Sequence, residues 1–264
     1  MEPIIRVRDL VAGYGGRTIL DGVSVDVALG RVTCIVGPSG CGKTTLLKCV
    51  VGLLRPLSGS VLVAGRELTA LDEQALPAAL ARVGLLFQQG AMLNSISVAD
   101  NVALPLREHT RLPDPVIAEM VRLKLELVGL SHAAGQLPSE LSGGMRKRAA
   151  LARAMALDPD LLLCDEPSAG LDPQTAAGLD VLILKLRETF RMSVVVVTHE
   201  LPSIDKIADD VVMLGRGGKL RFAGPLAEAR RSADPEVADF FARRTPEAAA
   251  GTSSLLDALE GRHA

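Results

Sequence analysis

The sequence is poor in aromatic residues and has no excess of positive charge. Only 2% of its 264 residues are aromatic, with one Tyr and no Trp, and the formal net charge at pH 7 is -2. Proteins that bind nucleic acids need a basic surface, and many of them stack bases on aromatic side chains. We therefore expect no nucleic-acid partner.

The chain also lacks a long hydrophobic run. Hydrophobic residues make up 48% of it and the mean hydropathy is +0.29. No apolar run approaches the ~20 residues that cross a bilayer. Residues 1–6 do not show the charged and then apolar pattern of a signal peptide. These features predict a protein that stays in the cytosol and docks on a membrane surface.

Cysteines are few, and none is part of a C-x-x-C pair or has a histidine beside it. This argues against disulfides and against a metal site, and it favours core or loop thiols in a reducing compartment. The four cysteines are Cys34, Cys41, Cys49 and Cys164.

A match to the pattern G-x-x-x-x-G-K-[ST] lies between a strand-like and a helix-like segment. Residues 31–36 before it are short, apolar and rich in β-branched side chains, and residues 46–51 continue a helix that Lys43 opens. In this context the pattern forms a phosphate-binding loop. The loop consists of Gly37, Pro38, Ser39, Gly40, Cys41, Gly42, Lys43, Thr44 and Thr45.

Each part of this loop has a chemical reason. Glycines let the backbone wrap a phosphate chain with its N–H groups pointing inward, and the N-terminus of the following helix adds partial positive charge. Lys43 then reaches the β- and γ-phosphates, and the Thr44 hydroxyl ligates Mg²⁺. The alternative is a glycine turn with an exposed lysine. Motifs elsewhere in the chain are needed to distinguish the two interpretations.

The strand-like segments predict an α/β domain. Residues 4–27 alternate like half-buried strands around a turn at Gly15-Gly16, which indicates a small antiparallel sheet. Later strands are continuous, apolar and separated by helices, which predicts a largely parallel sheet covered on both faces. Two further strands are expected at residues 60–63 and 83–87, and strands at residues 161–164, 193–197 and 211–214 alternate with helices near 175–188 and 201–208.

Two stretches depart from this alternation. Residues 98–157 are mostly helical, with breaks expected at Pro105, at residues 113–115 and at Gly129. Near the C-terminus, residues 233–241 predict a short amphipathic helix capped at Asp234. The rest is expected to be a flexible tail with a late helix at residues 253–259.

Two carboxylates follow the apolar strand at residues 161–164. Ligands of an open α/β sheet bind at the carboxyl ends of its strands. Asp165 is therefore expected to hold Mg²⁺ through water, and Glu166 to polarise an attacking water. A strand that ends in an acidic turn is common. Asp165 and Glu166 therefore indicate a nucleotide site only in combination with the phosphate loop.

Residues 141–144, Leu-Ser-Gly-Gly, stand at the start of a predicted helix. The Ser142 hydroxyl and the bare backbone N–H groups of Gly143 and Gly144 would lie at the positive end of the helix dipole, where they form a second anion site. The alternative is a helix cap followed by a basic, solvated turn.

With this motif the chain resembles the ATP-binding cassette (ABC) ATPases. Residues 141–145 are similar to the family signature, and the order of motifs matches over residues 2–225. The resemblance implies a P-loop NTPase fold with a RecA-like core, an N-terminal antiparallel β subdomain and a helical subdomain inserted at about residues 89–160. Residues 226–264 would form a C-terminal extension. It also implies ATP and Mg²⁺ as cofactors and ATP hydrolysis coupled to transmembrane transport.

Individual roles follow from the same resemblance. Gln88 resembles the glutamine that senses Mg²⁺ and the membrane partner, and His199 resembles the switch histidine that contacts the γ-phosphate. Asp165 and Glu166 resemble the Walker B aspartate and the catalytic base. Tyr14 resembles the adenine-stacking aromatic, although a partly buried packing role explains it equally well.

The family signature implies a dimer. In relatives, the signature of one subunit lies over the phosphate loop of the other, so Ser142, Gly143 and Gly144 would touch the γ-phosphate held by a second copy. Leu171 and Asp172 match the D-loop, and Asp172 is expected among the ATP-binding residues. Met145 stands where many relatives have glutamine, a position that follows the phosphate-contacting part, so ATPase competence is expected to survive. A head-to-tail homodimer is expected.

Three stretches, residues 87–102, 105–110 and 141–148, resemble the Mla/Mce-type ATPases. These energise movement of phospholipids or other hydrophobic molecules between the inner and outer membranes of bacteria. The resemblance implies an MlaE-like multi-pass permease, an MCE-domain protein and a STAS-domain regulator as partners, and a peripheral place on the cytoplasmic face of the inner membrane. The tail beyond residue 241 departs from that group, which leaves the regulator contact open.

Alternatives remain for some of these features. Met92, Leu93 and Ile96 either line the groove that receives the permease or close the core of the helical insert. An ATPase of a small-solute importer would share every ATPase motif. A cassette ATPase of DNA repair or ribosomes would need two cassettes, a coiled-coil insertion or a basic surface, and a kinase has no use for Leu-Ser-Gly-Gly-Met.

Overall fold

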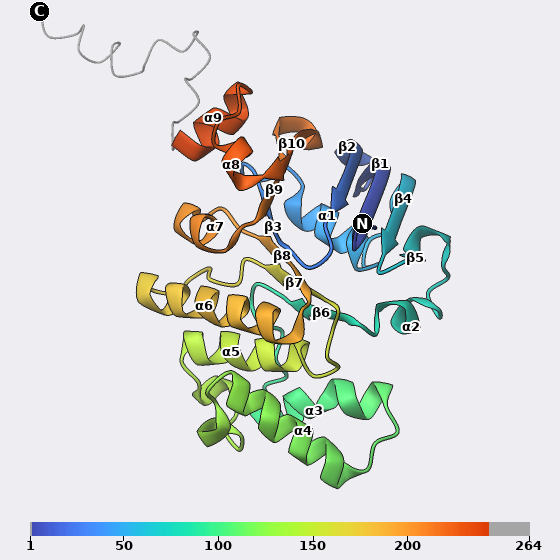
Figure 1. Ribbon diagram of the computed structural model, residues 1–264. Coiled ribbons are helices and arrows are strands. Elements are labelled where there is room, and N and C mark those ends of the chain that lie inside the picture. The colour runs from blue at the N-terminus through green and yellow to red at the C-terminus, as the bar shows by residue number, and fades with distance from the viewer. Residues whose placement is uncertain (1, 243–264) are drawn as a thin grey trace, which may run out of the picture.

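The computed structural model describes residues 2–242, which form two sheets with helices packed around the larger one (Figure 1). The flexible tail and the late helix expected at residues 253–259 lie outside the described residues.

The N-terminal sheet is antiparallel, as the alternating sequence predicts. Its strand order is β2-β1-β4-β5. The turn between β1 and β2 is made by Gly15 and Gly16, whose φ angles of 55° and 80° suit glycine. The strands are β1 (Ile5–Tyr14), β2 (Arg17–Val27), β4 (Ser58–Val63) and the short β5 (Arg66–Glu67).

The larger sheet has six strands in the order β10-β9-β3-β8-β7-β6. Five of them run parallel, and β10 pairs antiparallel with β9 at one edge. The sequence predicted the parallel strands but not β10. The bounds are β3 (Val32–Val36), β6 (Val83–Leu86), β7 (Leu161–Asp165), β8 (Ser193–Val197), β9 (Asp210–Leu214) and β10 (Leu220–Pro225).

Helices cover the larger sheet and also form a separate layer beyond it (Figure 1). The α-helices are α1 (Lys43–Val50), α2 (Leu76–Leu80), α3 (Val98–His109), α4 (Asp114–Leu127), α5 (Gly143–Ala154), α6 (Pro173–Phe190), α7 (Leu201–Ile207), α8 (Leu226–Ala229) and α9 (Pro235–Ala242). Short 3-10 turns occur at η1 (Leu68–Ala70), η2 (Ser131–Ala133), η3 (Pro138–Glu140) and η4 (Arg216–Gly218).

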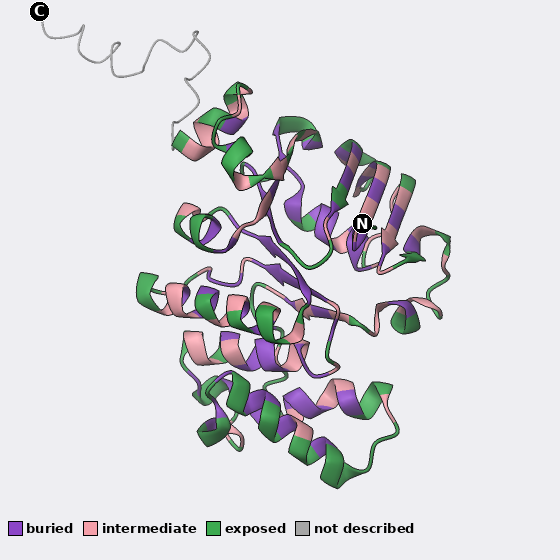
Figure 2. Ribbon diagram, viewed as in Figure 1, coloured by how far each residue is buried: buried purple, intermediate pink, exposed green. Residues whose placement is uncertain are grey.

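Buried side chains form three clusters. One lies between the small sheet, α1 and one face of the large sheet, and another lies on the opposite face under α5, α6 and α7. The third fills the space among α3, α4 and α5. Every residue of β3, β7 and β8 is buried, and Figure 2 shows these strands as a buried centre. Burial on both faces explains their uninterrupted apolar sequences.

The break expected at Pro105 is wrong, because Pro105 lies inside α3. A proline within a helix loses one backbone hydrogen bond. Here the buried face of the helix, with Val98, Val102 and Leu106 in the third cluster, holds the helix together through that position. The expected breaks near residues 113–115 and Gly129 are confirmed, since α4 begins at Asp114 and Gly129 follows its end.

The predicted cap at Asp234 is confirmed. Its Oδ1 accepts hydrogen bonds from the N–H groups of Glu236 at 2.9 Å and Val237 at 3.2 Å, at the start of α9. Val237 is fully buried and belongs to the same core cluster as β3 and β7. A domain boundary after residue 225 stays a prediction.

Asn101 ties the segment after β6 to α3. It is fully buried. Its Oδ1 accepts from Leu93 N at 2.8 Å, and its Nδ2 donates to the carbonyls of Leu93 and Ser97, both at 2.9 Å. These bonds leave no buried polar atom of the side chain unpaired.

We expect Asn101→Ala to lower the free energy of unfolding by about 2–4 kcal/mol, because it leaves buried backbone groups without partners. Urea unfolding followed by circular dichroism measures the loss. The exposed Asn94 in the same segment supplies the control, since Asn94→Ala should stay within about 0.5 kcal/mol of wild type. Equal stability of the two variants would contradict the role given to Asn101.

Candidate functional site

The phosphate loop follows β3 directly, and glycine is required at two of its positions. A Cβ on Gly37, whose φ is 142°, would stand 2.1 Å from the carbonyl oxygen of Leu214. A Cβ on Gly42, whose φ is 104°, would stand 2.6 Å from Leu20 Cδ2. The two glycines of the sequence pattern are thus fixed by close packing as well as by backbone conformation.

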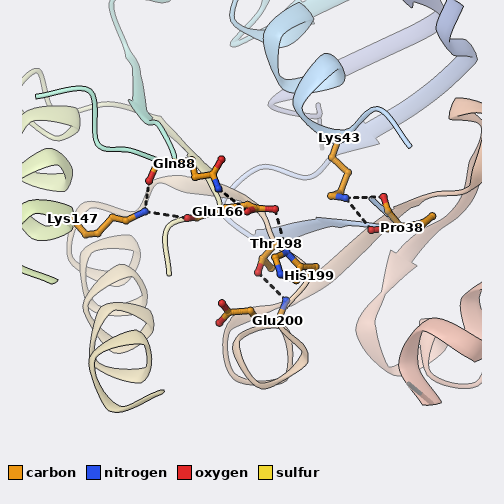
Figure 3. Close-up of polar contacts among 9 residues, drawn as sticks. Pro38, Lys43, Gln88, Lys147, Glu166, Thr198, His199 and Glu200 are labelled. Atoms are coloured by element: carbon orange, nitrogen blue, oxygen red, sulfur yellow. Dashed lines mark hydrogen bonds and ion pairs between the residues drawn. The ribbon is translucent and has the colours of Figure 1, made fainter. Parts of the chain in front are cut away.

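Lys43 lies within this loop and is buried. Only 9% of it is exposed. Its Nζ donates to the carbonyls of Gly37 at 2.9 Å and Pro38 at 3.0 Å (Figure 3). Thr44 in the same first turn of α1 is exposed, with its hydroxyl free to reach a ligand. The ammonium and the helix N-terminus together make this loop attractive to anions.

Three predicted side chains meet at the ends of neighbouring strands. The carboxylate of Glu166, just after β7, accepts a hydrogen bond from Gln88 Nε2 at 3.2 Å. Its other oxygen lies 3.2 Å from His199 Nδ1, which follows β8. Figure 3 shows Glu166 between the other two. The Glu166 side chain is 23% exposed, so a water molecule can reach it.

Asp165 is the last residue of β7 and is only 7% exposed. Burial raises the pKa of this carboxyl, and the charge of Glu166 raises it further, whereas Lys43, Lys48 and Lys147 oppose the rise. Two adjacent carboxyls in a partly dry site favour a bound cation, and their oxygens are ligands that Mg²⁺ prefers.

The Leu-Ser-Gly-Gly motif begins α5. The Ser142 Oγ caps the helix by accepting from Met145 N at 3.3 Å. A Cβ on Gly143 would meet Leu171, and one on Gly144 would meet Thr175, so both glycines face the start of α6 in the same chain. Figure 1 shows α1 and α5 on different sides of the larger sheet. Within residues 2–242, the signature and the phosphate loop do not meet.

Asp172 and Tyr14 lie at the edges of this region. Asp172 caps α6, accepting from the N–H groups of Gln174 at 3.1 Å and Thr175 at 3.0 Å. Hydrogen bonding, first with the Thr175 side chain and then with these N–H groups, lowers the pKa of Asp172. Tyr14 ends β1 and is 47% exposed, with its ring centroid 5.6 Å from Lys48 Nζ on α1. The Lys48 ammonium thus lies over one face of the ring, and adenine stacking stays a prediction.

Sequence reasoning missed Lys147. It lies in the basic run after the signature, which one interpretation treated as a solvated turn, yet it is only 8% exposed. Its Nζ donates to the carbonyls of Gln88 and Glu166 (Figure 3). The available signal was its helical spacing, since it shares the buried face of α5 with Ala150 and Leu151.

A phosphate loop after a buried parallel strand, with carboxylates at the end of a nearby strand, defines a P-loop nucleoside triphosphatase. None of the helices in the described part of the chain is long and apolar enough to span a bilayer.

Comparisons with known proteins agree with this class. Residues 20–169 match the family model described as ABC transporter. The chain is 44% identical to the intermembrane phospholipid transport system ATP-binding protein MlaF of Haemophilus influenzae, over 91% of this chain and 90% of that protein. It is 44% identical to MlaF of Escherichia coli K12, over 90% and 88%. A probable ribonucleotide transport ATP-binding protein, mkl, of Mycobacterium leprae is 40% identical over 91% and 69%.

Solved structures show the same fold. A dimeric ATP-binding cassette, MJ0796, in a post-hydrolysis state with ADP and Pi, aligns with a TM-score of 0.77 and 28% identity, over 84% of this chain and 98% of that one. The protein cbiO1 of Clostridium perfringens, part of the ABC transporter complex cbiONQ, aligns with a TM-score of 0.79 and 26% identity, over 93% of this chain and 97% of that one.

The chain belongs to the ABC transporter family, in which it is a nucleotide-binding ATPase subunit. Its likeness to MlaF across nine-tenths of both chains makes it an MlaF-like member. The predicted fold class, with its antiparallel N-terminal sheet and inserted helices, is confirmed.

We expect Glu166→Gln to reduce ATP turnover by about 10²–10⁴-fold while leaving ATP binding intact, because the amide keeps the shape but cannot accept a proton. Phosphate release measures turnover, and equilibrium binding of a fluorescent ATP analogue measures affinity.

Glu188 on the exposed side of α6 supplies the control for this test. Glu188→Gln makes the same chemical change away from the site and should leave both readings at wild-type values. An unchanged rate in Glu166→Gln would exclude Glu166 as the base.

Proposed function

We propose that this chain energises phospholipid transport between the inner and outer membranes of a bacterium, working with an MlaE-like permease and an MCE-domain protein. The observation that carries the proposal is the 44% identity to MlaF proteins over nearly the whole of both chains. The chain would lie on the cytoplasmic face of the inner membrane.

In this proposal, Lys43 and the N-terminus of α1 bind the β- and γ-phosphates of ATP. Thr44, Gln88 and, through water, Asp165 would hold Mg²⁺, which when bound would offset the phosphate charge. Glu166 takes a proton from the attacking water, and His199 contacts the γ-phosphate. The contacts of Glu166 with Gln88 and His199, each at 3.2 Å, support this division of roles.

We propose that two copies form the complete site. The signature at the start of α5 would cover the phosphate loop of a second copy, so that ATP lies between two half-sites. Support comes from the separation of these motifs within one chain and from the dimeric state of the structural relative MJ0796. Asp172, at the N-terminus of α6, would lie at the same interface.

A groove beside the ATPase core offers a place for the permease. It has a volume of about 420 Å³ and lies between α2, β6, α3 and α5. Leu80, Leu85, Pro105 and Leu157 give it an apolar lining, and Arg153 adds a cation. Helices of membrane partners bind such grooves through an apolar face.

The apolar residues Met92, Leu93 and Ile96, which follow Gln88, differ in how far they are buried. Met92 packs against two of the core clusters, whereas Leu93 is 46% exposed. Ile96 is half-buried, so Leu93 is the most exposed of the three, and we propose that Leu93 contacts the permease.

Mixed dimers test the shared site. We expect Lys43→Ala and Ser142→Arg each to abolish turnover alone. When the two chains carry different tags and the mixed complex is purified through both, one of its sites is intact, and about half of wild-type turnover should return. No recovery would show that each site is made within a single chain, whereas complexes with one variant in both copies set the baseline.

Co-purification tests the cargo and the partners. The tagged chain is extracted from native membranes in mild detergent, and mass spectrometry identifies the bound proteins and lipids. We expect a multi-pass permease, an MCE-domain protein and phospholipid. A permease with a solute-binding protein and no enriched lipid would contradict lipid transport and leave the ATPase intact.

Two variants, one in α2 and one directly after it, test whether the permease binds in the groove. Ala81 lines the groove, and Ala81→Arg should lose the permease from the purified complex. Ala78 is exposed and outside the groove lining, so Ala78→Arg should keep it.

The chain is also 40% identical to mkl, which is named a probable ribonucleotide transport ATP-binding protein. Ribonucleotides are therefore a second candidate class of cargo. In that case the same purification would yield nucleotide-binding partners and no phospholipid.

A further inference from the structure

Lys147 is a buried amine placed between two parts of the site. It lies on α5, three residues after Gly144, and is 8% exposed. Its Nζ donates to the backbone carbonyl of Gln88 and, at 3.3 Å, to that of Glu166 (Figure 3). One ammonium therefore holds the main chain of two residues whose side chains meet at 3.2 Å.

The backbone at Glu166 needs such support. Its φ of 45° is in the left-handed region, which costs a non-glycine residue roughly 1–2 kcal/mol. Residues in such conformations persist when their surroundings hold them. The N–H of Glu166 donates to Val197 O at 2.9 Å, and its carbonyl accepts from Ala169 N at 3.2 Å as well as from Lys147. Of these three partners of the Glu166 main chain, Lys147 is the one that carries a charge.

A second cation of the same helix holds the segment after Gln88. Arg153 donates to the carbonyls of Gly90 at 2.9 Å and Ala91 at 2.7 Å. The helix that carries the signature at its N-terminus thus binds this segment at two places. Lys147 alone also reaches Glu166.

The burial of Lys147 has a cost that its contacts offset. Burial lowers its pKa, and the nearby Glu166 carboxylate opposes that fall. The protein has a comparable buried lysine elsewhere: Lys124, which is 6% exposed, pairs with Asp158 and lies over the Phe190 ring. The ion-pair partner of Lys124 is Asp158, which lies between α5 and β7, whereas the hydrogen bonds of Lys147 go to the backbone of the site.

We propose that Lys147 is a positioning residue for hydrolysis: its ammonium holds the Glu166 and Gln88 main chain so that the Glu166 carboxylate faces the attacking water. The inference rests on the proposed role of Glu166. It connects the helix that begins with the signature directly to the hydrolytic carboxylate of the same chain.

Kinetics of the full chain, purified with its membrane partners, test this. Lys147→Met should lower kcat about tenfold to a hundredfold, the scale expected when a catalytic group is misplaced by about 1 Å. KM for ATP should stay within about twofold, because the phosphate loop is untouched. Lys147→Arg keeps the charge and donors and should recover part of kcat.

Two further variants separate positioning from folding and from the proposed function. Lys124→Met removes an equally buried amine and should lower the thermal unfolding midpoint without changing kcat. In the Glu166→Gln background, Lys147→Met should cost nothing more, because a residue that acts through Glu166 has nothing left to position.

The outcomes are distinct. A wild-type kcat in Lys147→Met, or a loss matched by Lys124→Met in proportion to its lower midpoint, overturns the positioning role. Full turnover in Glu166→Gln overturns the assignment of the base itself, whatever Lys147 does. A loss in Lys147→Met that Lys147→Arg partly restores, with KM unchanged, supports the proposal.

Discussion

The site depends on one constraint, which is that parallel strands end at the same edge of their sheet. In the larger sheet, Leu86 pairs with Cys164, Asp165 with Val197, and Ile35 with Val197, so β6, β7, β8 and β3 finish level with one another. Whatever residue follows each strand is therefore placed beside the others. Complete burial of the central strands limits sliding, because a shifted strand would draw the polar residues that follow it, such as Glu166, into the apolar core. The arrangement of the site is thus a consequence of sheet packing, and its chemistry comes from the residues that follow the strands.

The local sequence pattern was sufficient to predict those parts of the fold that depend on interactions between residues close in sequence. The phosphate loop, the parallel strands and the caps at Ser142 and Asp234 depend on residues near in sequence, and the structure has them where the pattern predicts. The antiparallel edge strand β10 was missed because its half-exposed alternation is short and its pairing with β9 is a tertiary event. The break at Pro105 was wrong for a related reason, since packing in the helical layer outweighs the lost hydrogen bond.

The same division applies to the site. Gln88, Glu166 and His199 were predicted from separate motifs, and their meeting at 3.2 Å follows from strand order. Lys147 could not be predicted, because its role depends on two carbonyls whose positions only the folded sheet defines. A lysine in a basic run gives no sign in the sequence that it is buried, apart from a helical spacing shared with apolar neighbours. Tyr14 shows a further limit, since a half-exposed ring with Lys48 over it suits a ligand and does not identify one.

A single helix, α5, links the features that a transport ATPase has to couple. Its N-terminus carries Ser142, its middle holds the main chain at Gln88 and Glu166, and Arg153 near its C-terminus both lines the groove and holds the Gly90 and Ala91 carbonyls. A rigid helix cannot move at one end without moving the groups attached along it. In the proposed dimer, contact of the signature with ATP and docking of a permease would therefore bias the position of the same helix. Because coupling of binding free energies is reciprocal, a permease state that favours one placement of α5 must be favoured in turn by ATP bound across the dimer. In the proposed complex, the direction of that preference would depend on which permease state fits the groove when the two copies are closed.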